Sequence, residues 1–284
     1  MTLVEAKLLE DGMRIESDSL TIDAHAARTG NLYGALKAVV LHPGLCVAYA
    51  GRVAAAQHAL DAVGVRPDTP FSVEEVERTL LQHHLSALKE TDFLVASLTP
   101  LPSLSVVRDG TVVRGLTSAY VGLPSAHAAF ERAFAMADIP QGADVTDDSL
   151  LAARMDSAIR AVIEDPDESL VDGVPLSVTV EGGFLYATRG EMRAGASQSI
   201  PSHQWTTLRF GGAAEGGFAY VVCPAVEPGV GAVGVHFHQG NLGALFYPTV
   251  SGEPIKFSSV TLHEFEGQVR ERYGIVIKAG MKIQ

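Results

Sequence analysis

Positive charge is scarce in this chain, and cysteine is scarcer still. The 284 residues include 21 Lys and Arg against 33 Asp and Glu, which gives a formal net charge of −12. A nucleic-acid binder needs a basic face for phosphate groups, and none is visible here. The two cysteines, Cys46 and Cys223, lie far apart in apolar runs, as buried free thiols usually do. A disulfide framework, a cysteine-based zinc site and a nucleic-acid partner therefore have no support.

Long hydrophobic runs are also missing. The longest apolar stretch with few charges, residues 218–237, is interrupted by Pro224, Glu227 and Pro228, whereas a membrane helix needs about 20 apolar residues. The first residues lack the basic-then-apolar pattern of a signal peptide. We therefore expect a cytoplasmic protein with no membrane partner. Hydrophobic residues make up 47% of the chain, enough for a large core.

Pairs of turn residues alternate with helical stretches along the chain. Asp11-Gly12 separates strands predicted at 3–8 and 13–19, and Pro43-Gly44 separates two more between 39 and 50. Helices are predicted at 52–63 and 72–89, strands between 93 and 121, helices at 126–137 and 148–163, and strands between 174 and 188. Hairpins alternating with helix pairs exclude a doubly wound parallel sheet. We predict an α+β fold, an αββα four-layer sandwich with the helices outside.

The last third of the chain has a different pattern. Residues 189–203 are rich in Gly, Ser and polar groups, which predicts a long loop. A domain covering residues 1–190 is thus expected to be followed by a strand-rich C-terminal extension, residues 191–284. We expect this extension to pack on the domain, because its exposed aromatic side chains would form a large apolar patch. These are Trp205, Phe210, Phe218, Phe237, Phe246 and Phe257.

Four candidate residues occur in order along the first strands. Thr2 opens the segment Thr-Leu-Val-Glu-Ala-Lys-Leu-Leu-Glu-Asp-Gly, and Asp18 follows sixteen residues later. Lys37 lies in Leu-Lys-Ala-Val-Val-Leu, and Gly51 ends Ala-Tyr-Ala-Gly before a helix. This series resembles the opening half of proteasome β subunits and of the bacterial peptidase HslV, which are N-terminal-nucleophile hydrolases. The resemblance covers about residues 2–190. Lys37 comes three residues later than in that family, which places an insertion within residues 25–31.

The resemblance implies roles for these four residues. Thr2 is the expected nucleophile, and its own amine, freed by removal of Met1, is the expected base. A buried Lys37 near the hydroxyl would favour its ionisation, and Asp18 would keep Lys37 charged and oriented. Gly51 leaves room for a substrate carbonyl, so its N–H is the expected oxyanion donor.

Further candidates are Ser125, Asp165 and Ser169. Gly122-Leu-Pro-Ser125 stands where the family has Gly-Ser-Gly, so Leu123 occupies the serine position unless Ser125 replaces it. Asp165-Pro-Asp-Glu-Ser169 resembles the family's Asp-x-x-Ser-Gly-Gly loosely, without the glycine pair.

Three functions agree with this pattern. The first is a threonine-type amide hydrolase, a self-compartmentalising peptidase acting on peptide or protein substrates. The second is a catalytically inactive proteasome-like scaffold or binding subunit, and the third is a small-amide or acyl hydrolase on the same fold. The resemblance also implies a homo-oligomeric ring and an ATP-dependent unfoldase as partner. No cofactor and no metal are expected; His236-Phe-His238 has metal-site spacing but lacks an identifiable third ligand, which favours a polar strand face.

Overall fold

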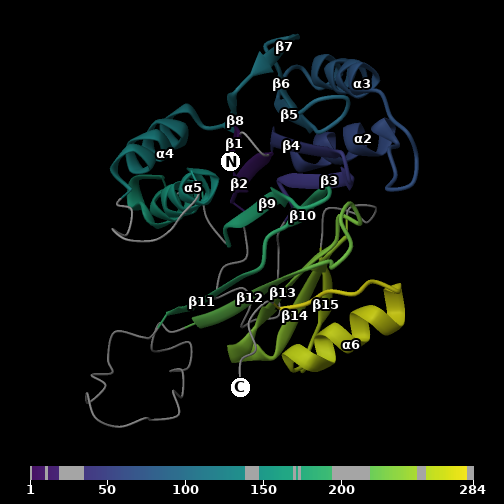
Figure 1. Ribbon diagram of the computed structural model, residues 1–284, viewed down its shortest axis with the longest axis vertical. Helices are drawn as coiled ribbons and strands as arrows, with labels where there is room; N and C mark the ends of the chain where they lie inside the picture. Colours follow the sequence, from purple (N-terminus) through teal and green to yellow (C-terminus); the bar gives the residue numbers. More distant parts are fainter. Residues whose placement is uncertain are drawn as a thin grey trace.

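Over the residues that the computed structural model describes, three antiparallel sheets and a set of helices make up a mixed α+β fold (Figure 1). The structure describes residues 2–9, 12–18, 35–137, 147–168, 171, 174–193, 218–247 and 254–279. Each sheet has five strands. No helix in these ranges is both long and apolar enough to cross a membrane.

The first sheet carries the start of the chain near its middle. Its strand order is β10-β9-β2-β1-β8, with all neighbours antiparallel. The strands are β1 (Leu3–Leu8), β2 (Met13–Ser17), β8 (Ser118–Gly122), β9 (Leu176–Val180) and β10 (Phe184–Tyr186). Val4 pairs with Ser17, and Leu3 pairs with Gly122. The beginning of β1 is therefore held between the end of β2 and the end of β8.

The second sheet is a meander, because its strand order β3-β4-β5-β6-β7 follows the chain. Its strands are β3 (Ala38–His42), β4 (Leu45–Gly51), β5 (Thr91–Ser97), β6 (Ser103–Arg108) and β7 (Thr111–Leu116). The predicted turn at Pro43-Gly44 joins β3 to β4, and Asp109-Gly110 joins β6 to β7 with both residues at positive φ.

A helix pair packs on each of these two sheets. Helices α2 (Val53–Val63) and α3 (Val73–Ser86) contact the second sheet, and α4 (Pro124–Met136) and α5 (Asp147–Glu164) contact the first. Local caps bound two of these helices: the Ser72 hydroxyl accepts the Glu75 amide at the start of α3, and Gly64 ends α2 in the left-handed region. A short 3-10 turn, η1 (Pro166–Glu168), follows α5.

Strand alternation divides the buried residues of the first sheet between two cores. Val4 and Ala6 of β1 pack with the second sheet, in a cluster that includes Val47 and Leu94. Leu3 faces the opposite way, into a cluster with Phe130 of α4 and residues of α5. The two sheets also contact each other through β8 and β4 to β6.

The C-terminal sheet has the order β11-β12-β13-β14-β15 and is covered on one face by α6. Its elements are β11 (Arg189–Arg193), β12 (Phe218–Pro224), β13 (Val233–Phe237), η3 (His238–Gly240), β14 (Leu242–Phe246), β15 (Ile255–Phe257) and α6 (Leu262–Tyr273). The prediction of a loop from residue 189 is wrong for 189–193, because β11 pairs there with β12; residues 194–203 lie outside the described ranges. Near the C-terminus, Ile277 forms an isolated antiparallel bridge with Ala225.

The C-terminal sheet contacts the rest of the molecule around Pro43. The Gly229 amide donates to the Phe184 carbonyl at 2.9 Å, and a side chain at Gly229 would collide with the Pro43 ring. Of the aromatic residues behind the predicted packing, Phe237, Phe246 and Phe257 are buried. Trp205, Phe210 and the Phe218 side chain lie outside the described residues. The division at residue 190 and the packing of the whole extension remain predictions.

Candidate active site at the start of the first strand

Thr2 and Asp18 lie side by side because the β1–β2 register makes them neighbours. The Thr2 hydroxyl donates to Asp18 Oδ1 at 2.5 Å, and the Leu3 amide donates to the same oxygen at 3.0 Å. The Asp18 amide in turn donates to the Leu3 carbonyl at 3.3 Å. Both side chains are buried: Thr2 is 1% exposed and Asp18 0%. Two residues sixteen positions apart are therefore joined by a side-chain hydrogen bond, and a main-chain bond between Leu3 and Asp18 holds the strands beside it.

Burial dominates the electrostatics of Asp18. It raises the pKa of this carboxyl from 3.8 to about 6, while hydrogen bonds from Thr2 and Leu3 and the charge of Lys37 act in the opposite direction. Asp18 Oδ2 has no hydrogen-bond partner within the described part of the chain. One oxygen of the carboxylate thus holds the hydroxyl, and the other is open to interact with a nearby cation.

Lys37 is the nearby cation. It is 3% exposed and immediately precedes β3, and its Nζ lies 5.3 Å from the centroid of the Tyr49 ring. Burial lowers the pKa of Lys37, and the charge of Asp18 raises it. Over the described residues, Asp18 forms its direct contacts with Thr2 and Leu3, and no ion pair joins it to Lys37. Asp18 therefore acts on two groups: it accepts a hydrogen bond from the Thr2 hydroxyl, and its charge favours the protonated form of Lys37.

Gly51 lies at the predicted junction of strand and helix. It is the last residue of β4, and Arg52 is the N-cap of α2. Its φ of +124° is in a region that L side chains rarely adopt, and a Cβ there would lie 2.1 Å from the Glu90 carbonyl oxygen. Glycine is required here by the backbone alone, so its presence does not by itself indicate an oxyanion site.

The second set of candidates is not brought to Thr2. The Ser125 hydroxyl is exposed and donates to Glu168 Oε2 at 3.0 Å. Asp165 Oδ1 accepts the Asp167 amide at 2.9 Å in the turn after α5. Among the described residues, neither side chain forms a hydrogen bond with Thr2. Ser169 lies outside the described ranges.

The segment that reaches Thr2 does so through its backbone. The Leu123 amide donates to the Thr2 carbonyl at 3.1 Å. Gly122 has a φ of +127°, and a Cβ there would lie 2.0 Å from the Thr2 carbonyl oxygen. Gly122 and Leu123 therefore position Thr2 through their backbone. The sequence analysis considered this segment only for a serine side chain and did not indicate that role.

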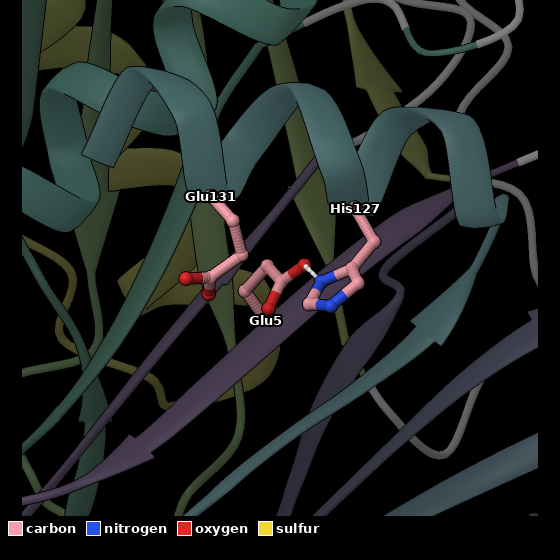
Figure 2. Close-up of side chains that lie close together, drawn as sticks. All are labelled: Glu5, His127 and Glu131. Atoms are coloured by element: carbon pink, nitrogen blue, oxygen red, sulfur yellow. Dashed lines mark hydrogen bonds and ion pairs between the residues drawn. The ribbon is translucent and has the colours of Figure 1, made fainter. Parts of the chain in front are cut away.

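Two other groups differ from the sequence expectations or add to them. His236 is 1% exposed, and its Nε2 lies 2.8 Å from the Val260 carbonyl oxygen, so the expected polar strand face is in fact buried. Glu5, His127 and Glu131 form a cluster on the face of the first sheet that α4 covers (Figure 2), which the sequence analysis did not single out. Cys46 and Cys223 are buried free thiols, as predicted.

Comparison with known proteins gives similarities among solved structures alone. No family model and no curated protein matches the sequence. Among solved structures, an Anbu mutant from Hyphomicrobium sp. strain MC1 is similar, at 15% sequence identity and a TM-score of 0.45. The similarity covers 64% of this chain and 83% of that chain.

Proposed function

We propose that residues 2–186 form an αββα sandwich of the N-terminal-nucleophile hydrolase type. The arrangement in Figure 1 supports it: one helix pair packs on each of two antiparallel sheets, and the sheets contact each other. We further propose that the chain is a threonine-type amide hydrolase acting on peptides. The observation that carries this proposal is the buried hydrogen bond from the Thr2 hydroxyl to Asp18, with Lys37 buried nearby.

The proposed reaction begins with attack of Thr2 Oγ1 on the carbonyl carbon of an amide. The free amine of Thr2, exposed by removal of Met1, accepts the hydroxyl proton and passes it to the leaving amine. The C–N bond breaks and a Thr2 ester remains, which water hydrolyses to release the acid and restore the hydroxyl. The Gly51 N–H would stabilise the negative charge on the carbonyl oxygen.

Asp18 and Lys37 would supply the electrostatic part of this mechanism. Burial lowers the pKa of Lys37, and the charge of Asp18 opposes this and favours the protonated form. The positive charge of protonated Lys37 would stabilise the alkoxide that forms when the Thr2 hydroxyl loses its proton. Asp18 Oδ1 fixes the direction of the hydroxyl, because it accepts bonds from both Thr2 and Leu3. Removal of either charge would therefore affect turnover.

A catalytically inactive scaffold is the second candidate, and two observations favour it. Thr2 is 1% exposed, and Leu123 occupies the position at which the resembling family carries a serine. In this case the hydrogen bond from Thr2 to Asp18 would have a structural role alone, joining β1 to the end of β2. The assembly into a homo-oligomeric ring, proposed for both candidates, is tested by light scattering: a 30 kDa monomer at micromolar concentration would refute it.

Intact mass and peptide turnover distinguish the two candidates. For the hydrolase, purified protein lacks Met1 and cleaves fluorogenic peptides, and Thr2→Ala abolishes cleavage. Thr117→Ala, the same chemical change at an exposed position, serves as control and keeps full activity. If Thr2→Ala cleaves as well as the natural sequence, the nucleophile is wrong. If the protein has a free Thr2 and cleaves nothing, the scaffold is correct.

A further inference from the structure

The cluster of Glu5, His127 and Glu131 is built from one strand and one helix. Glu5 lies on β1, and its side chain points to the face that α4 covers (Figure 2). His127 and Glu131 are four residues apart on α4, so they lie on the same face of that helix. His127 Nδ1 is 2.6 Å from Glu5 Oε1. One ligand atom from each residue lies within 4.8 Å of the other two.

Glu5 has an unusual environment for a carboxyl group. It is 0% exposed, and its second oxygen, Oε2, has no hydrogen-bond partner among the described residues. Burial raises the pKa of Glu5 to about 7, in spite of the hydrogen bond to His127. Unpaired buried oxygens are costly and are uncommon in folded proteins. A bound ligand that contacts Oε2 would remove this cost.

The imidazole of His127 is held in one orientation before any ligand arrives. The Tyr120 ring stacks on it, with ring centroids 3.7 Å apart and an angle of 5° between the planes. The guanidinium of Arg108 lies over the Tyr120 ring at 4.6 Å and donates to the Tyr120 carbonyl at 3.0 Å. A stack of three side chains from different elements thus restrains the ring, so less side-chain ordering is needed when a ligand binds.

We propose that Glu5, His127 and Glu131 bind a divalent transition-metal ion, with Zn²⁺ as the best fit. Imidazole nitrogen and carboxylate oxygen are ordinary zinc ligands, whereas Mg²⁺ and Ca²⁺ prefer oxygen alone. Tetrahedral zinc with bonds of about 2.0–2.2 Å separates its ligand atoms by about 3.5 Å. The atoms of the cluster lie within 4.8 Å of one another, and His127 and Glu5 are 2.6 Å apart, so the side chains must shift when the ion binds. Glu131 can supply that movement, because its side chain is 41% exposed.

Lys7 lies beside the cluster, and its ammonium group would have to move when an ion binds. Its Nζ lies 2.9 Å from Glu131 Oε1 and 3.3 Å from the Ser118 hydroxyl. Glu131 has a second carboxylate oxygen, so the ion can bind without expelling Lys7 entirely. Solvent reaches the cluster at His127 and Glu131, whose side chains are 29% and 41% exposed, and this gives the ion a route to the buried Glu5. The bound ion would link α4 to β1, three residues after Thr2.

Zinc titration of the full chain tests this proposal independently of any peptidase activity. Protein freed of metals with a chelator should bind one equivalent of Zn²⁺ in calorimetry, and its thermal midpoint should rise. Loss of a residue that is hydrogen-bonded to a metal ligand lowers metal affinity roughly 10- to 100-fold. Glu5→Gln and His127→Gln remove ligands themselves, so they should weaken zinc binding by more than this. His58→Gln, an exposed histidine on α2, should bind zinc as the natural sequence does.

Two further measurements keep the outcome clear. Glu131→Gln changes a half-exposed residue, so it should fold normally and still lose affinity; circular dichroism checks the fold of each variant. Co²⁺ bound in place of Zn²⁺ should give the visible absorption bands of a four-coordinate site. Absence of saturable zinc binding would overturn the proposal, as would equal affinity in the Glu5, His127 and Glu131 variants. Displacement of the zinc by excess Mg²⁺ would overturn the choice of ion.

Discussion

Replacing Glu5 by Gln should make the protein more stable at neutral pH and leave it nearly unchanged in acid. The pKa of Glu5 rises from 4.5 to about 7 on folding, because the side chain is buried. The native state therefore holds a proton that the unfolded state releases between these pH values, so stability falls as the pH rises through them. At roughly 1.4 kcal/mol per pH unit, the full effect is about 3 kcal/mol. Gln is neutral throughout and can donate to His127.

Urea denaturation at a series of pH values measures this difference. The free energy of unfolding of Glu5→Gln should exceed that of the natural sequence by about 3 kcal/mol at pH 8, and the excess should vanish near pH 4.5. All samples contain a chelator, so that no metal binds to Glu5. Glu271→Gln, an exposed residue of α6, is the control. A pH-independent difference, or a destabilised Glu5→Gln at pH 8, would refute the assignment of Glu5 as a buried carboxyl whose second oxygen has no partner among the described residues.

Three other substitutions test the site and the C-terminal sheet. Asp18→Ala removes the acceptor of two buried hydrogen bonds and the negative charge near Lys37, so the melting midpoint should fall along with turnover. Thr2→Ala should abolish turnover and leave the melting midpoint nearly unchanged. Gly122→Ala should destabilise by about 2 kcal/mol or more and abolish turnover, because its Cβ would collide with the Thr2 carbonyl; Gly182→Ala, also at positive φ but in open space, should cost less than that. Phe265→Ala should cost about 3–5 kcal/mol in urea unfolding, since its buried ring packs directly on two glycines of the C-terminal sheet.

Local signals in the sequence predicted most of the elements. A turn pair such as Pro43-Gly44 favours a hairpin, and the structure joins the antiparallel strands β3 and β4 at that point. The Ser72 cap and the Gly64 stop bound two helices for equally local reasons. The juxtaposition of Thr2 with Asp18 also follows from a local rule, since an antiparallel hairpin brings its two ends together.

Features that depend on distant contacts were not predicted. Ser125 carries a hydroxyl near the expected position, but the direction of a side chain at the start of α4 depends on Glu168, 43 residues away. The strand at residues 189–193 has a loop-like composition, and pairing with β12 overrides it. Glu5 could have been found from strand alternation, because it lies between the inward Val4 and Ala6, and a carboxyl on that side meets whatever covers the sheet.

The position of Thr2 is set by the backbone, and this bears on which substitutions the site can tolerate. Its carbonyl accepts the Leu123 amide, and the next residue, Leu3, exchanges hydrogen bonds with Asp18. The threonine methyl group contributes to none of these bonds. Serine at position 2 would therefore place its hydroxyl at nearly the same point, with a χ1 angle that the methyl group no longer restricts. A hydrolase should thus keep reduced but measurable turnover in Thr2→Ser. Complete loss would mean that the methyl group, and not only the hydroxyl, takes part in positioning the reacting oxygen.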